Sequence, residues 1–166
     1  MKKLEHPDIL HLRAADGWLG LGDCVSANNE LDEITPELRA HPDVQLMRCR
    51  IYQAARKWDL IVPVAETLVQ QMPKMSEAWI QRSYALHELK RTEEAYDLLL
   101  PAAKLLPKMW VIRYNLACYA CVMGKLKIAM ERLKQAIDLA GEDEDIRLQA
   151  LGDPDLKKIW TLIPAI

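Results

Sequence analysis

Residues 76–109 read SEAWIQRSYALHELKRTEEAYDLLLPAAKLLPKM, and this stretch decides the fold. Small and apolar residues recur in it at Trp79, Ala95, Leu99, Ala102 and Pro107. This spacing is typical of two short helices that pack antiparallel and end at a proline. Because a single helical hairpin cannot bury its own apolar face, the stretch predicts a chain of stacked hairpins that leaves one surface free.

The same pattern recurs when the window is moved by 34 residues in either direction. Residues 42–75 end in the same PKM, and residues 110–143 keep small or apolar side chains at the positions of helix contact. Residues 8–41 keep the pattern more loosely. The sequence therefore predicts an all-α fold of about four helical hairpins in a single domain that spans residues 1–166.

Turn signals divide each window into a first and a second helix. These turns are expected near Gly22 and Asp23, Arg56 and Lys57, Lys90 and Arg91, and Gly124 and Lys125. Pro63 and Pro101 fall within second helices, where a proline removes a backbone hydrogen bond and crowds the previous turn. We expect a kink at each of these prolines, or a helix that begins late.

The C-terminal residues 144–166 depart from the period. Residues 145–151 are predicted to form a helix, and a second one begins after the GDPDL break with Pro154 near its first turn. Four apolar side chains of this last segment share one face at helical spacing: Leu156, Ile159, Trp160 and Ile163. A helical stack needs a terminal element that covers its last apolar face, so we expect a C-terminal capping helix.

Two other uses of this amphipathic tail stay open. Its apolar face could pack against a second copy of the chain in a self-assembling structural protein. It could also lie on a membrane, with Lys157, Lys158 and Trp160 toward the lipid head groups, although two lysines and one tryptophan are weak evidence for this.

Composition excludes several classes of function. The chain has 22 Lys and Arg against 24 Asp and Glu, and the two signs are interspersed, so no basic stripe for nucleic acid is present. The N-terminal MKKLEHPDIL lacks the apolar run of a secretory signal. The longest apolar stretch, residues 116–123, is far short of the roughly 20 residues that cross a bilayer. We expect a cytoplasmic protein.

The offsets within residues 76–109, together with YNLACYACVMG at 114–124, resemble tetratricopeptide repeats. The resemblance covers residues 8 to about 143 and is strongest in the last two windows. It implies a right-handed α-α superhelix, a solenoid whose concave wall is made by the first helices and binds a peptide segment or a helix of a partner protein. It implies no enzymatic activity.

A narrower resemblance rests on the order of several motifs, namely GWLGLGD, ITPELRAHPD, KWDLIVPVAETLV, YALHELKRTEEAYDLLLP, YNLACYACVMGKL and LGDPDLKKIW. This order is similar to that of small stand-alone bacterial tetratricopeptide proteins. Some of these are likened to kinesin light chains, including ones that are encoded beside bacterial tubulins. The resemblance implies a cytoskeleton-associated adaptor, with a tubulin-like filament as a candidate partner.

The best-understood groove in the family grips a C-terminal carboxylate with Lys, Arg and Asn on three first helices. The corresponding positions here are Leu46, Arg50, Gln81, Val111 and Asn115. Only the asparagine matches outright, so the sequence does not support a carboxylate clamp.

The concave wall that the resemblance implies has its own set of side chains. They are Ile9, Leu12, Leu46, Arg50, Gln53, Ile80, Tyr84, His87, Tyr114, Asn115 and Cys118. Tyrosine and arginine are enriched in binding hot spots, so this mixed surface favours a partly apolar ligand segment. The alternative is that Tyr84 and Tyr114 only fill space between adjacent first helices.

Two arginines, Arg48 and Arg82, occupy positions where the family usually buries leucine. Their charged heads must reach solvent or an acidic side chain such as Asp16 or Glu77. We expect structural ion pairs, with contact to a partner protein as the alternative.

A competing hypothesis is a thiol- or metal-dependent protein that uses Cys118 and Cys121, which form a CxxC. A reactive pair needs a helix N-terminus to lower its pKa, and a zinc site needs two further ligands. The pair lies within a predicted helix, and Cys24 and Cys49 belong to other hairpins, so reduced thiols packed in a core are expected. The histidines are scattered, and we expect no catalytic residues, no metal and no cofactor.

Overall fold

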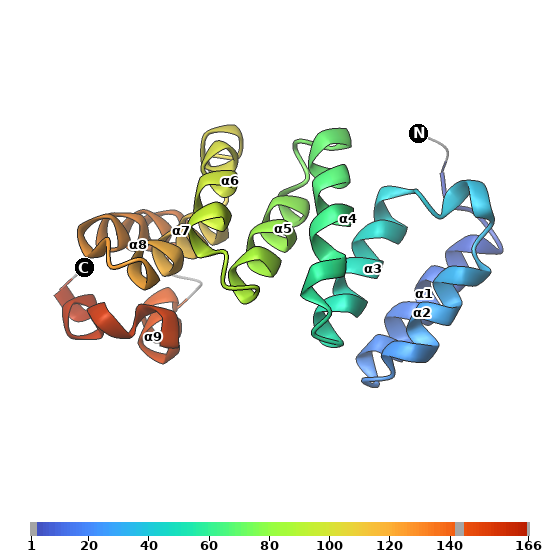
Figure 1. Cartoon of the computed structure of the whole chain (residues 1–166), viewed down its shortest axis with the longest axis horizontal. Coiled ribbons are helices and arrows are strands. Elements are labelled where there is room, and N and C mark those ends of the chain that lie inside the picture. Colours follow the sequence, from blue (N-terminus) through green and yellow to red (C-terminus); the bar gives the residue numbers. More distant parts are fainter. Residues whose placement is uncertain (1–2, 142–144, 166) are drawn as a thin grey trace. The chain divides into compact units, whose positions relative to one another are not determined.

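The computed structural model describes residues 3–141 and 145–165, and helices are the regular structure in these ranges (Figure 1). The first helices of the hairpins are α1 (Asp8–Gly20), α3 (Pro42–Ala54), α5 (Ser76–Glu88) and α7 (Trp110–Val122). The second helices are α2 (Cys24–Glu33), α4 (Trp58–Gln71), α6 (Thr92–Leu105) and α8 (Leu126–Ala140). Both series begin at intervals of 34 residues, so the predicted all-α hairpins are confirmed.

The turn between the two helices of each hairpin repeats one backbone conformation. A residue with positive φ occurs at the same position in all four: Gly22 (80°), Arg56 (55°), Lys90 (65°) and Gly124 (78°). The N–H that follows bonds to the carbonyl five residues earlier, as in Lys125 N to Ala120 O at 2.8 Å. This is the pattern of a left-handed helix C-cap. The chain forms the expected turn at all four positions, even where the residue is not glycine.

Pro63 and Pro101 lie inside α4 and α6, and neither helix begins late. Both prolines are exposed. The hydroxyl of Thr67 donates to the carbonyl oxygen of Pro63 at 3.0 Å.

The chain divides into two compact units, residues 1–85 and residues 86–166, which we call unit 1 and unit 2. The boundary falls within α5. The single-domain organisation stays a prediction.

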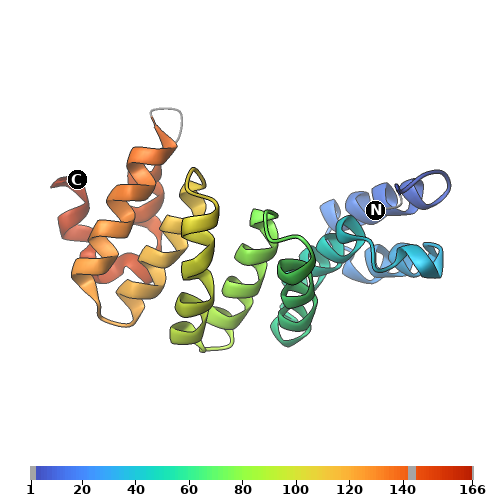
Figure 2. The ribbon, with the colours of Figure 1, turned by 90° about the horizontal axis from the view of Figure 1, so that it is seen from above.

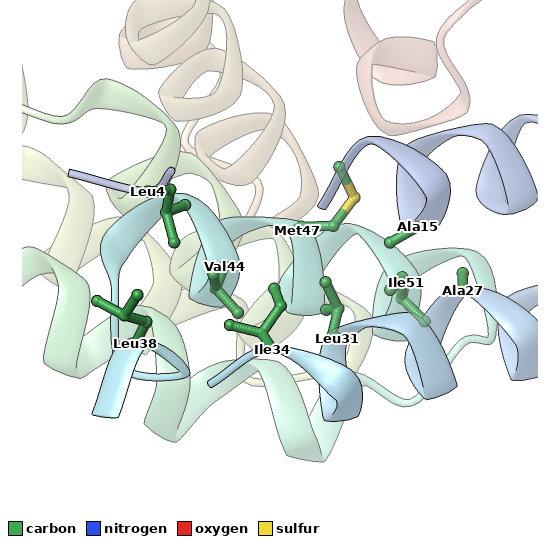
Figure 3. Close-up of a cluster of buried hydrophobic side chains, with 9 residues drawn as sticks. All are labelled: Leu4, Ala15, Ala27, Leu31, Ile34, Leu38, Val44, Met47 and Ile51. Atoms are coloured by element: carbon green, nitrogen blue, oxygen red, sulfur yellow. The ribbon is translucent and has the colours of Figure 1, made fainter. Parts of the chain in front are cut away.

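The core of unit 1 forms between the first hairpin and α3. Side chains from α1, α2, α3, the short 3-10 helix η1 (Pro36–Leu38) and the segments beside them gather there (Figure 3). Its buried members are Leu4, Ala15, Ala27, Leu31, Ile34, Leu38, Val44, Met47 and Ile51. A second cluster of Cys49, Ile61, Ala65 and Ala85 continues the core to α4 and α5.

Unit 2 is built around α7, whose side chains are buried along most of its length. Helix α8 packs beside α7. The C-terminal elements α9 (Ile146–Gly152) and η2 (Pro154–Ala165) contact this pair, and Figure 2 shows them in red beside the orange helices.

The cap is confirmed in position. Leu156, Ile159 and Ile163 of η2 are fully buried, whereas Trp160 is half-buried. The last helix is of the 3-10 type, and its first turn closes with a bond from Leu156 N to the Asp153 carbonyl at 3.0 Å. Such i to i+3 bonds tighten the turn relative to an α-helix.

Candidate functional site

Six predicted groove residues belong to unit 1 and lie on its first helices. We call them the unit 1 face: Leu12, Leu46, Arg50, Gln53, Ile80 and Tyr84. Residues four apart share one side of a helix, so Leu46 and Arg50 of α3 point to the same side, as do Ile80 and Tyr84 of α5. Arg50 is exposed, whereas the aliphatic and aromatic members are more deeply set. Ile9 and Leu12 also pack against the core.

Polar contacts join the first helices of unit 1 along this face. Arg50 Nη1 lies 2.9 Å from Asp16 Oδ1, which links α3 to α1. The amide nitrogen of Gln81 donates to Gln53 Oε1 at 2.8 Å, which links α5 to α3. The side chains of Arg50 and Asp16 are 49% and 55% exposed, so this ion pair contributes little to stability and can exchange partners.

Tyr84 has a structural contact and stays partly exposed. Its ring meets that of Trp58 edge-on, with centroids 5.6 Å apart and an interplanar angle of 77°. Such an edge-on pair favours a space-filling role for part of the ring. The ring is nevertheless only half-buried.

Arg48 and Arg82 form structural ion pairs, as expected, but with other carboxylates. Arg48 Nη2 lies 3.0 Å from Asp32, and Arg82 Nη1 lies 2.6 Å from Glu66. The expected partner Asp16 instead meets Arg50. Both observed partners come from the second helix that precedes the arginine in the chain, α2 or α4, which the periodicity of the first helices does not reveal.

The environment of these pairs favours the charged forms. Burial opposes the charge of Arg48, but hydrogen bonds to Asp32 and Tyr52 outweigh it and raise the pKa of the guanidinium. The hydrogen bond from Arg82 lowers the pKa of the Glu66 carboxyl. Arg82 is 4% exposed and stacks over the Trp79 ring at 4.9 Å.

Unit 2 places its predicted groove residues beneath the tail. Tyr114 Oη donates to Asp153 Oδ2 at 2.9 Å, and the Cys118 thiol lies 3.5 Å from the same oxygen. His87 Nε2 lies 3.0 Å from Asp155 Oδ2. These three side chains are buried, so the chain itself covers the first-helix positions of unit 2. Asn115 is half-buried.

Further contacts hold the tail in this place. Trp160 Nε1 donates to the Asp153 carbonyl at 3.1 Å, which closes the segment on itself. Lys158 Nζ donates to the Val122 carbonyl at the end of α7 at 3.0 Å. Lys157 is exposed. The break GDPDL, with its two aspartates around Pro154, is the sequence signal that could have drawn attention to these contacts.

The CxxC lies within α7 in surroundings that suppress thiolate formation. Burial, reinforced by Asp153, raises the pKa of the Cys118 thiol well above its usual value. Burial also raises the pKa of Cys121. A reactive cysteine needs the opposite shift. Within residues 3–141 and 145–165, no group of three or more His, Cys, Asp or Glu side chains could hold a metal ion.

Over the same ranges, none of the helices has both the length and the apolar character needed to cross a membrane.

No family model matches the sequence, and a search of the curated proteins gives no match. Solved structures do resemble it. MamA 41-end from Desulfovibrio magneticus RS-1 superposes with a TM-score of 0.73 at 16% identity, over 98% of this chain and 96% of that chain. The MamA RS-1 ArsTM double mutant gives a TM-score of 0.72 at 16% identity, over 86% and 80%.

A third similar structure is TTC0263, a thermophilic TPR protein in Thermus thermophilus, with TPR standing for tetratricopeptide repeat. Its TM-score is 0.72 at 19% identity, over 96% of this chain and 100% of that chain. Identities this low support the fold alone. The chain therefore has the solenoid fold of tetratricopeptide-repeat proteins, whereas the narrower resemblance to kinesin-light-chain-like proteins stays a prediction.

Proposed function

We propose that this chain is a non-enzymatic interaction scaffold in which the unit 1 face binds a segment of a partner protein. The main support is a difference in burial between equivalent side chains of the repeats. Ile80 and Tyr84 keep partly open side chains, whereas their equivalents 34 residues later, Tyr114 and Cys118, are covered by the tail. This difference supports a binding surface on unit 1.

The side chains of the unit 1 face define the chemistry of the ligand. Leu12, Leu46 and Ile80 offer aliphatic contact. Arg50 offers a charged donor that forms an exposed ion pair with Asp16 and a weak contact with the Met47 sulfur at 3.9 Å. Gln53 of this face accepts a hydrogen bond from the Gln81 amide at 2.8 Å and adds a polar group between α3 and α5. A helix or extended segment with apolar and acidic side chains fits this set.

Capture from the native cell, repeated with substituted chains, tests this proposal. Arg50→Glu and Tyr84→Ala are expected to reduce the amount of the retained partner without changing helical content. Arg13→Glu is the matched control, because Arg13 is an exposed residue of α1 outside the unit 1 face and its replacement changes the charge equally. Retention that is equal in all variants would assign binding to another surface.

A tubulin-like filament is the narrower partner that the kinesin-light-chain-like resemblance implies, and a cytoplasmic location belongs to the same proposal. Co-sedimentation with purified filaments of a bacterial tubulin tests it. Binding that saturates and weakens in Arg50→Glu supports a cytoskeletal role. If the chain does not co-sediment and a different protein is retained on capture, the scaffold function still holds, but a tubulin-like filament is excluded as the partner.

A further inference from the structure

A cavity of about 430 Å³ opens on unit 2 among α6, α7 and α8. Its polar lining comes from Lys104, Arg113, Arg132, Gln135 and Asp138, and Leu100 and Leu139 contribute aliphatic walls. The cavity shares no residue with the unit 1 face or with the groove positions beneath the tail. Its chemistry is therefore independent of the function proposed above.

Arg113 is fixed at the edge of this cavity by the end of α6. Its Nη2 donates to the Ala103 carbonyl at 2.6 Å and its Nη1 donates to the Leu106 carbonyl at 3.2 Å. These carbonyls belong to the end of a helix, where intrahelical donors are missing. The guanidinium thus has a defined position, with further N–H groups available.

Arg132 of α8 brings a second guanidinium to the same cavity. Its Nη1 donates to Gln135 Oε1 at 3.0 Å, whereas its Nε is buried without a hydrogen-bond partner among the described residues. An unsatisfied buried donor is costly, particularly on a charged group. The charge of Arg132 is therefore incompletely compensated by the described residues.

The two arginines of the cavity repel each other. Burial, followed by the charge of Arg132, lowers the pKa of Arg113. Within residues 3–141 and 145–165, the ion pairs of the chain include neither arginine, and Asp138 lines the cavity without pairing to them. Like charges held together in this way favour a bound anion.

We propose that this cavity binds a phosphate monoester dianion, which the guanidinium groups of Arg113 and Arg132 grip with help from Lys104. Three cationic side chains against Asp138 leave a formal charge of +2 in the lining. A phosphate monoester carries about −1.5 to −2 near neutral pH, so the charges match. Planar guanidinium groups donate in pairs to such oxyanions, and Leu100 and Leu139 can contact the organic part of the ester.

Titration with inorganic phosphate, followed by ¹⁵N NMR of the arginine Nε–H signals, tests the site in the full chain. Arg132→Lys removes one such signal and so assigns it. The Arg132 signal is expected to shift and saturate. A signal that does not move, or that moves linearly without saturation, would overturn the proposal.

Arg132→Gln and Lys134→Gln form a matched pair, because both remove one charge from α8 and Lys134 is exposed outside the cavity. Arg132→Gln is expected to weaken phosphate binding by about tenfold or more, which corresponds to about 1.4 kcal/mol, and Lys134→Gln to leave it nearly unchanged. Equal weakening in both would show general attraction to a basic surface and would contradict the site.

The source of the phosphate is resolved by two further probes, a small organic phosphate monoester and a phosphoserine peptide with its unphosphorylated form as control. Tighter binding of the peptide than of free phosphate would assign the group to a phosphorylated protein. Tighter binding of the small ester would assign it to a free ligand. Either result supports recognition of the phosphate group, whereas equal binding of the unphosphorylated peptide would contradict it.

Discussion

Tyr114→Phe removes a single hydroxyl at the contact between α7 and the tail. That hydroxyl donates to Asp153 Oδ2 at 2.9 Å from a side chain that is 4% exposed. A hydrogen bond to a charged group contributes about 1.5–3 kcal/mol. Because Asp153 is half-buried and keeps the Cys118 thiol at 3.5 Å, we expect the lower end, about 1.5 kcal/mol of lost stability in unit 2.

Native-state hydrogen exchange of the α7 amides measures this loss in unit 2 directly. Tyr96→Phe is the matched control, since Tyr96 is a buried tyrosine of the same unit that contacts Lys125 through its ring, a contact that phenylalanine keeps. Its protection is expected to stay nearly unchanged.

A double-mutant cycle with Asp153→Asn isolates the pairwise contribution. We predict a coupling energy of about 1 kcal/mol between Tyr114 and Asp153, because the two groups share a charge-assisted hydrogen bond. Effects that add within roughly 0.5 kcal/mol would refute the assignment of the tail as a fixed cover of α7.

Other contacts in the chain give three further predictions. Lys90→Gly is expected to raise stability by about 0.5–1 kcal/mol in thermal unfolding, because Lys90 has φ 65° and glycine adopts this conformation without steric cost. A lowered melting temperature would contradict the turn geometry. Arg82 lowers the pKa of Glu66 in the folded state, so the stability from this pair is present above the unfolded pKa near 4.5 and is lost as pH falls through the folded pKa. Glu66→Gln should therefore flatten the acid dependence of stability, measured by urea unfolding at a series of pH values. An unchanged dependence on pH would refute the contribution of this ion pair. The buried Cys118 thiol should resist alkylation in the native protein while the half-buried Cys24 reacts first, and rapid labelling of Cys118 would contradict its burial beneath the tail.

The helical architecture could be predicted from the sequence because the same pattern of helix and turn residues recurs in each repeat. The first helices begin at Asp8, Pro42, Ser76 and Trp110, the starts of the four predicted windows. The turns were also predictable. The positive φ of Arg56, which matches that of Gly22, could not be predicted, because the repeat imposes this conformation and the residue type does not favour it.

Contacts between a first helix and a second helix, or between a helix and the tail, could be predicted less well. The partners of Arg48 and Arg82 come from second helices, whereas the period places only residues of equivalent helices relative to one another. The tail lies outside the period, so periodicity gives its apolar face but not the position of Asp153 against Tyr114. The open and covered first-helix positions are equivalent in the sequence pattern and differ only through this aperiodic segment.

Which face binds a partner is tested most directly by hydrogen exchange of the full chain with and without the captured partner. We predict added protection in α1, α3 and the part of α5 that belongs to unit 1, with the exchange of α7 and η2 unchanged. Added protection on α7, together with faster exchange of η2, would mean that the partner displaces the tail and would contradict the assignment of the unit 1 face.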